Sequence, residues 1–299
     1  MLSGNDGVRP QQTTQLCSHC GGPLSRLAQR CPHCYRPGAY PNVEYAACSF
    51  ERSELEKRYR LALSLAETEQ HRLRLSELEA CLAESEACRV IPESELRRLA
   101  ASDSQVAITY YGQLTSGMRL PDGASDRLRR IADTILFTGY SEEISFAAIT
   151  VDDRWMKSYG DAAIYFKEES IAHRASVFEG NSMRWIHDQA YSERAPVGSL
   201  SKNTLEIPPG YRATWDWRHK LGVAKLATDL REPHRTIADC VLSEAPEPSE
   251  NRFIEVHIFG TFSIRSVKRI RVLSDALSPN GRKALEETAE RLSIELIIQ

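Results

Sequence analysis

Two pairs of cysteines near the N-terminus have the residue types and spacing that metal chemistry requires. Cys17 and Cys20 form one C-x-x-C pair, and Cys31 and Cys34 form a second after ten intervening residues. Each pair can form a tight turn that directs two thiolates to one ion, and two such turns complete a tetrahedral zinc site. Because protein supplies all four ligands, the sequence predicts a structural zinc ribbon rather than a catalytic metal.

The role of this ribbon stays open between three alternatives. Zinc ribbons dock proteins or dimerise, bind nucleic acid, or serve only as a structural cap. The nearby basic residues are Arg26, Arg30 and Arg36, with Tyr35 beside the last. This basic patch is thin for phosphate-dominated affinity, so the sequence favours protein docking over the other two roles.

A second candidate for chemistry is a carboxylate within an apolar strand. Residues 253–259 read FIEVHIF, and strand alternation places Phe253, Glu255 and His257 on one face. A carboxylate in so apolar a run is costly unless it faces a cleft or a charged partner. Glu255 is therefore either a catalytic carboxylate or one half of a structural ion pair with an arginine such as Arg174 or Arg265. His257 could assist proton transfer or simply pack.

The stretch 159–182, YGDAAIYFKEESIAHRASVFEGNS, combines a short apolar strand with a Gly-Asn turn. Arg174 is the only arginine or lysine between Lys167 and Arg184. Its guanidinium could hold a carboxylate or a phosphate through two parallel hydrogen bonds, or it could form an ordinary surface ion pair.

Two segments resemble the ADP-ribosyltransferase superfamily, many of whose bacterial members are toxins or phage-defence effectors. These are residues 159–182 and residues 253–272, FIEVHIFGTFSIRSVKRIRV, and the likeness covers roughly residues 106–272. The resemblance implies transfer of ADP-ribose from NAD to a macromolecule through a sugar cation like that of glycoside hydrolysis. Such a site needs a carboxylate for the ribose, an aromatic surface for nicotinamide and donors for the pyrophosphate.

The resemblance assigns the catalytic role to Glu255. Many relatives carry Glu or Gln two residues earlier, where this chain has Phe253, and this departure leaves the acceptor group open. Tyr111 and Gly112 stand where the superfamily usually has Arg or His followed by Gly on its first strand.

The resemblance also implies the remaining NAD contacts. Ser145 matches the Ser/Thr element of the second strand, in preference to Thr150. Tyr159 would stack on nicotinamide, as Trp155 also could, and Arg174 would clamp the phosphate or the ribose. Asn181 and Ser182 would belong to the loop over the ligand.

Composition is ordinary for a soluble globular protein, with 41% hydrophobic and 26% charged residues and a net charge of −3. That charge gives no global attraction to nucleic acid. The absence of a long apolar run predicts a cytoplasmic protein with no membrane contact. No Rossmann, P-loop, H-E-x-x-H or G-x-S-x-G motif is present.

The sequence predicts an α+β protein in four parts. Residues 1–15 would form a disordered tail, 16–48 the zinc ribbon, 49–103 a helical spacer with a possible coiled coil, and 104–299 an ADP-ribosyltransferase-like domain with a mixed β core and flanking helices. The spacer would hold one long helix from residue 53 to about residue 88 and a short helix after Pro92.

Within the last part, strands are expected at 106–111, 144–151, 162–166, 253–259 and 266–272, and helices at 126–136, within 211–230 and at 281–297.

The predicted function is thus an ADP-ribosyltransferase of the toxin or phage-defence type. Its partners would be NAD as substrate, structural zinc, a protein or nucleic-acid acceptor, and an antitoxin or regulatory partner held by the ribbon or the helix. The alternatives are a non-enzymatic zinc-ribbon adaptor that binds protein or nucleic acid, and an NAD glycohydrolase.

Overall fold

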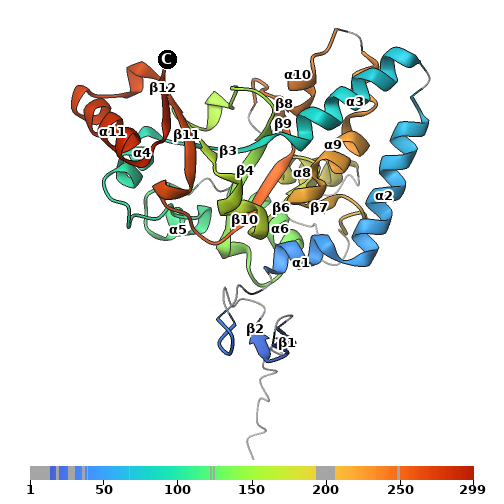
Figure 1. Ribbon diagram of the computed structural model, residues 1–299, viewed down its shortest axis with the longest axis horizontal. Coiled ribbons are helices and arrows are strands. Elements are labelled where there is room, and N and C mark those ends of the chain that lie inside the picture. Colours follow the sequence, from blue (N-terminus) through green and yellow to red (C-terminus); the bar gives the residue numbers. More distant parts are fainter. Residues whose placement is uncertain are drawn as a thin grey trace, which may run out of the picture.

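The computed structural model describes residues 14–17, 20–25, 31–35, 38, 40–66, 68–121, 123, 125–192, 206–232, 234–247 and 250–299. Within these residues the chain forms a mixed α+β body around an eight-stranded sheet, together with a small two-stranded unit near the N-terminus (Figure 1). The α+β class expected from the sequence is confirmed.

The large sheet has the strand order β12-β11-β5-β3-β4-β10-β6-β7. β11 and β12 are parallel, and all other neighbours are antiparallel. Its strands are β3 (Glu86–Ile91), β4 (Ile144–Thr150), β5 (Ala162–Phe166), β6 (Ala175–Phe178), β7 (Arg212–Thr214), β10 (Glu255–Phe259), β11 (Val267–Val272) and β12 (Glu295–Ile298). Two small antiparallel pairs lie outside it: β1 (Thr14–Leu16) with β2 (Pro23–Ser25), and β8 (Leu242–Ser243) with β9 (Arg252–Phe253).

Helices cover both faces of this sheet, and β10 shows how its residues divide between them. Val256 and Ile258 belong to the main core with the helices α2 (Ser49–Ser64), α3 (Glu69–Ala83), α4 (Glu93–Ala100), α9 (Arg218–Leu226) and α11 (Pro279–Leu292). The opposite face, which carries Glu255, His257 and Phe259, lies under α6 (Ser125–Leu136) and α8 (Ser182–Ser192). Shorter helices are α1 (Pro41–Ala47), α5 (Tyr110–Thr115), α7 (Glu168–Ile171) and α10 (Ile237–Val241).

The predicted helical spacer is wrong, because this region is built into the body. The single helix expected from residue 53 to about residue 88 is divided, and Thr68 caps α3 by accepting a hydrogen bond from the His71 N–H at 3.1 Å. The residues after α3 form β3, which pairs with β4 and β5 inside the sheet. Both α2 and α3 pack on α9 of the same chain, which buries Leu55, Leu75, Leu78 and Leu82, whereas Phe50, Leu61, Leu63 and Leu73 remain exposed.

Two further expectations differ from the structure. The strand predicted at 106–111 is reduced to one bridge between Val106 and Ser263, and α5 begins at Tyr110 because Thr109 caps it. The terminal helix ends at Leu292, where Ser293 takes a left-handed conformation with φ of 54°, and the chain continues as β12. The other four predicted strands and the short helix after Pro92 are confirmed, with small shifts of their ends.

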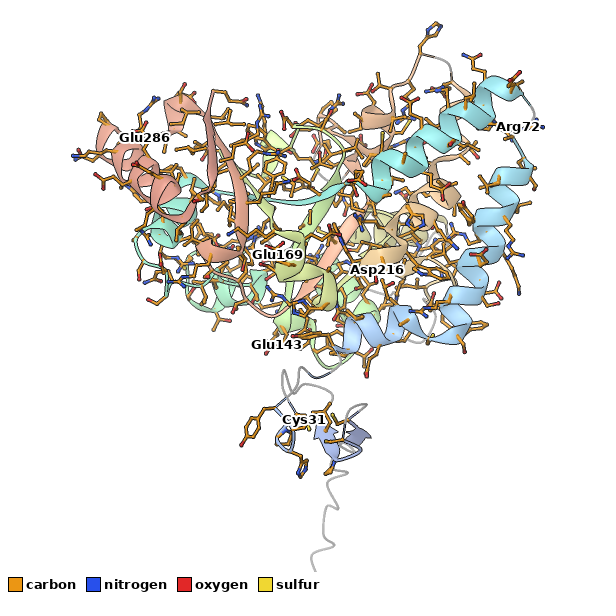
Figure 2. The ribbon with its side chains drawn as sticks, viewed as in Figure 1. Cys31, Arg72, Glu143, Glu169, Asp216 and Glu286 are labelled. Atoms are coloured by element: carbon orange, nitrogen blue, oxygen red, sulfur yellow. The ribbon has the colours of Figure 1, made fainter. Side chains whose placement is uncertain are left out.

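The N-terminal unit of β1 and β2 lies apart from the body, and Figure 2 shows Cys31 within it. The tail predicted at residues 1–15 falls almost entirely outside the described residues. Among the helices that the structure describes, none combines the length and the apolar character needed to cross a bilayer.

Candidate functional site

The four cysteines of the N-terminal unit meet at one point. The ligand atoms of Cys17, Cys20, Cys31 and Cys34 all lie within 4.8 Å of one another. The Sγ atoms are 3.7 Å apart for Cys17 and Cys34 and 3.6 Å apart for Cys20 and Cys31, much longer than a disulfide bond. This four-cysteine cluster could hold a metal ion in the way the spacing predicts, and its donor set of four sulfurs suits zinc.

Local backbone geometry positions the cluster. The Cys17 N–H donates to the Gly22 carbonyl at 2.8 Å, and Gly21 has a φ of 70°, which favours glycine. A side chain at Gly22 would meet the His33 ring at 2.6 Å, so the second glycine makes room for that ring. His33 therefore packs beside the cluster.

Glu255 lies at the centre of a buried polar network between β10, α6 and α8. Nη1 and Nη2 of Arg129 each donate to Glu255 Oε1 at 3.1 Å. The Ser182 N–H, at the start of α8, donates to Oε2 at 3.0 Å, and His257 Nε2 lies 3.4 Å from the same oxygen. The side chain of Glu255 is 3% exposed and that of Arg129 is 8% exposed, so the carboxylate is enclosed.

Arg129 joins this carboxylate to a second one. Its Nε lies 3.2 Å from Asp133 Oδ1, one helical turn away on α6, and the Tyr111 hydroxyl donates to Asp133 Oδ2 at 2.9 Å. Arg129 Nη1 also donates to the Ser182 hydroxyl at 3.2 Å, and its guanidinium lies 3.5 Å from the centre of the Phe146 ring. One arginine thus bridges two buried acids and touches α8.

The network separates the pKa values of its two acids. Burial alone would raise the pKa of Glu255, but Arg129 and His257 outweigh burial and lower that pKa to about 2. Burial dominates for Asp133 and raises its pKa to about 6, although Arg129 and Tyr111 oppose the shift. The pKa of His257 is lowered, chiefly by burial, so its ring is neutral at physiological pH.

Tyr159 lies at the surface beside this network. It is 41% exposed, and its pKa, raised chiefly by burial, responds to a hydrogen bond with Asn251 and to the charges of Glu255 and Arg129. Asn251 is fully buried and its carbonyl accepts a bond from Asn181 at 3.5 Å, just before α8.

Other predicted NAD contacts lie elsewhere. Ser145 pairs with Ile258, on the sheet face opposite Glu255, and donates to the Gly260 carbonyl at 3.1 Å. On the face of the network, β4 instead presents Phe146 opposite His257 and Ala148 opposite Glu255. Gly112 is packed against Ile108, whose side chain would lie 2.6 Å from an added Cβ, so it offers no open approach for a ligand.

The two arginines considered as partners of Glu255 are engaged with other groups. Arg174 donates to the backbone carbonyls of Ser170 at 3.0 Å, Phe259 at 2.7 Å and Thr261 at 2.9 Å. Arg265 pairs with Asp103 at 2.8 Å. Glu255 does form an ion pair with an arginine, and this arginine is Arg129 rather than Arg174 or Arg265.

Sequence reasoning missed Arg129, Asp133 and the main-chain N–H of Ser182 as neighbours of Glu255. The available signal was the i, i+4 spacing of Arg129 and Asp133 on a predicted helix. Arg127 and Arg130 flank the same position, so the sequence offers three arginines without selecting one.

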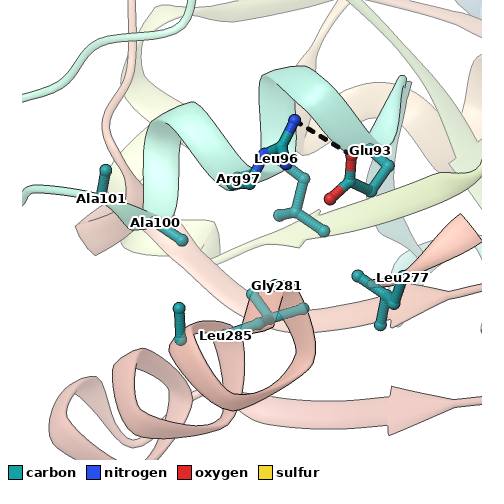
Figure 3. Close-up of a pocket in the computed structure, with 9 residues that line it drawn as sticks. Glu93, Leu96, Arg97, Ala100, Ala101, Leu277, Gly281 and Leu285 are labelled. Atoms are coloured by element: carbon teal, nitrogen blue, oxygen red, sulfur yellow. Dashed lines mark ion pairs between the residues drawn. The ribbon is translucent and has the colours of Figure 1, made fainter. Parts of the chain in front are cut away.

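A separate small cavity lies between α4 and α11, as Figure 3 shows. It measures about 90 Å³ and is lined mostly by apolar side chains such as Leu96, Leu277 and Leu285, with an ion pair of Glu93 and Arg97 at 3.7 Å. This cavity can admit one apolar side chain but not a dinucleotide.

Comparison of the chain with protein-family models and with curated proteins gives no match.

Proposed function

We propose that this chain is an ADP-ribosyltransferase of the bacterial toxin or phage-defence type, centred on Glu255 and carrying a zinc-binding head. The observation that carries the proposal is the meeting of Arg129, Ser182 and Glu255, which are supplied by three separate elements. A guanidinium, a helix N-terminus and a carboxylate are the groups that a dinucleotide and a developing sugar cation require. The superfamily resemblance supplies the substrate, NAD.

The proposed reaction begins with loss of the Arg129 contact to Glu255. Oε2 keeps its hydrogen bond from the Ser182 N–H, so Oε1 is the atom released to accept a hydrogen bond from a ribose hydroxyl. A pyrophosphate is a suitable competitor for Arg129, because guanidinium binds phosphate oxygens with two parallel bonds. Tyr159, exposed beside the network, would contact the nicotinamide ring.

In the proposed reaction, one bond at C1′ of the ribose breaks and another forms. The bond between C1′ of the ribose and the nicotinamide nitrogen breaks, and nicotinamide leaves as a neutral molecule. Glu255 stabilises the sugar cation, and an acceptor nucleophile forms a bond to C1′ while its proton passes to solvent. The acceptor would be a protein or a nucleic acid, and the zinc-binding head would select that target or hold a regulatory partner.

A direct test uses NAD labelled in the ADP-ribose moiety. Label on protein or on nucleic acid supports the proposal and identifies the acceptor class, whereas free labelled ADP-ribose indicates an NAD glycohydrolase. Glu255→Gln keeps the size of the side chain and should abolish turnover, while Glu286→Gln, at an exposed position on α11 that Figure 2 labels, should leave it unchanged. Absence of turnover by the wild-type chain with metal bound contradicts the proposal.

The enclosed carboxylate favours a second candidate, a non-enzymatic adaptor. In this alternative the Glu255 network fixes α6 and α8 on the sheet, and the four-cysteine cluster organises a docking surface. Arg26, Arg30 and Arg36 are the only Lys or Arg residues in the sequence of the ribbon, and Tyr35 is 73% exposed, which suits a protein partner better than nucleic acid. Tyr35→Ala would then abolish partner binding without changing the stability of the body.

A further inference from the structure

Lys225 lies behind the candidate site, on the last turn of α9. Its Nζ donates to the Glu179 carbonyl and lies 3.5 Å from the Phe253 carbonyl. Glu179 comes three residues before Ser182, and Phe253 comes two residues before Glu255. One ammonium group thus joins two backbone segments. Ser182 follows one segment and Glu255 follows the other, and the Ser182 N–H donates to Glu255 Oε2.

The surroundings of Lys225 indicate that this arrangement is specific. The side chain is partly buried, and its bonding partners are neutral carbonyl groups rather than an acid. The carboxylate of Glu179 pairs with Arg58 at 2.5 Å instead. A Cβ at Gly180 would lie 3.4 Å from Nζ, so the ammonium fits closely against this turn.

We infer that Lys225 is a positioning residue, which sets the Ser182 N–H against Glu255 by tying the turn before α8 to the segment before β10. Its consequence for catalysis rests on the proposed function, but its consequence for local structure does not. Burial lowers the pKa of Lys225 to about 8, while Glu179 and Asp229 oppose this and Arg252 and Arg184 reinforce it. The charge-assisted bonds should therefore weaken as the pH rises above 8.

The test is amide hydrogen exchange in the full chain, read at Ser182 by NMR. Lys225→Met should reduce the protection of this amide about tenfold, and Lys225→Arg should restore most of it. Lys220→Met is the matched control: Lys220 lies on the same helix as Lys225, and its replacement removes a salt bridge to Glu56 of α2 and should leave Ser182 unchanged. In the wild-type chain, protection corrected for intrinsic exchange should fall between pH 7 and 9.5, a measurement that needs no variant.

Unchanged Ser182 protection in Lys225→Met, or an equal loss in Lys220→Met, would overturn the inference. If Lys225→Met does not fold, a flat wild-type protection profile up to pH 9.5 overturns it instead. Should the wild type turn over NAD, Lys225→Met should lower kcat about tenfold with KM unchanged. Failure of the proposed function removes only this last readout, because the exchange measurement does not depend on activity.

Discussion

Replacing Arg129 with Met tests the buried network most directly. The substitution keeps a long side chain against Phe146 but leaves Glu255 and Asp133 without their shared counter-charge, and these two acids are 3% and 0% exposed. Removing one partner of a buried ion pair costs about 3–5 kcal/mol, largely because the remaining charge stays desolvated. For a body of this size each kcal/mol lowers Tm by about 2–4 °C, so we expect a loss of roughly 10 °C at pH 7.

The assay is thermal and urea unfolding of the full chain with its metal, compared with Arg130→Met. Arg130 is the next residue on α6 and is exposed, so its replacement should cost less than about 0.5 kcal/mol. Adding Glu255→Gln to the Arg129→Met chain should recover part of the loss, because it removes one of the two uncompensated charges. A loss of stability for Arg129→Met below about 1 kcal/mol, or equal to that of Arg130→Met, would show that Glu255 and Asp133 do not depend on Arg129 as their buried counter-charge.

Three other predictions follow from the same structure. The pKa of Glu255 is lowered from 4.5 to about 2 on folding, so its ionisation stabilises the fold by about 3 kcal/mol above pH 4.5. This stability should be lost as the pH falls toward 2. In Glu255→Gln, the free energy of unfolding measured against pH should not show this decrease. The pKa of Asp133 is raised from 3.8 to about 6, so stability should increase as the pH falls from 6 to 4, and Asp133→Asn should remove this increase. Cys31→Ser should abolish binding of one zinc per chain, measured by metal analysis, while the unfolding transition of the body stays in place, because the ribbon has its own small core.

The sequence predicted the four-cysteine cluster because its determinants are local. Each C-x-x-C pair brings its own turn, and two such pairs need only to meet once to complete the site. The strands at 144–150, 162–166 and 255–259 were also predictable, since runs of β-branched and aromatic residues favour a buried strand wherever they pair. Because a charged side chain in a buried strand needs a partner, the sequence also indicated that Glu255 would have a specific contact.

The identity of that partner was not predictable from one sequence. Arg129 and Glu255 are 126 residues apart, and only the packing of α6 on the sheet brings them together. The strand β3 was missed because no Gly or Pro separates Glu86–Ile91 from the Glu- and Leu-rich helix before it, and its pairing with β4 and β5 is set by tertiary contacts. In both cases the deciding contacts are tertiary, so local propensity and residue spacing do not predict them.

The position of Arg129 between two acids bears on whether the enclosed carboxylate can open. If Arg129 had Glu255 as its sole partner, separating them would leave a buried arginine and a buried glutamate, each uncompensated. Asp133 changes this balance, because Arg129 keeps that ion pair, and Glu255 keeps the Ser182 N–H and His257 on Oε2. Under the proposed function, moving Arg129 from Glu255 to a substrate phosphate would replace one anion with another while Arg129 stays paired with Asp133. Burial raises the pKa of Asp133 to about 6, which still lies below neutral pH, so Asp133 remains a charged partner for the buried Arg129. Under the proposed function, this asymmetry favours a site that can open over an ion pair that stays permanently closed.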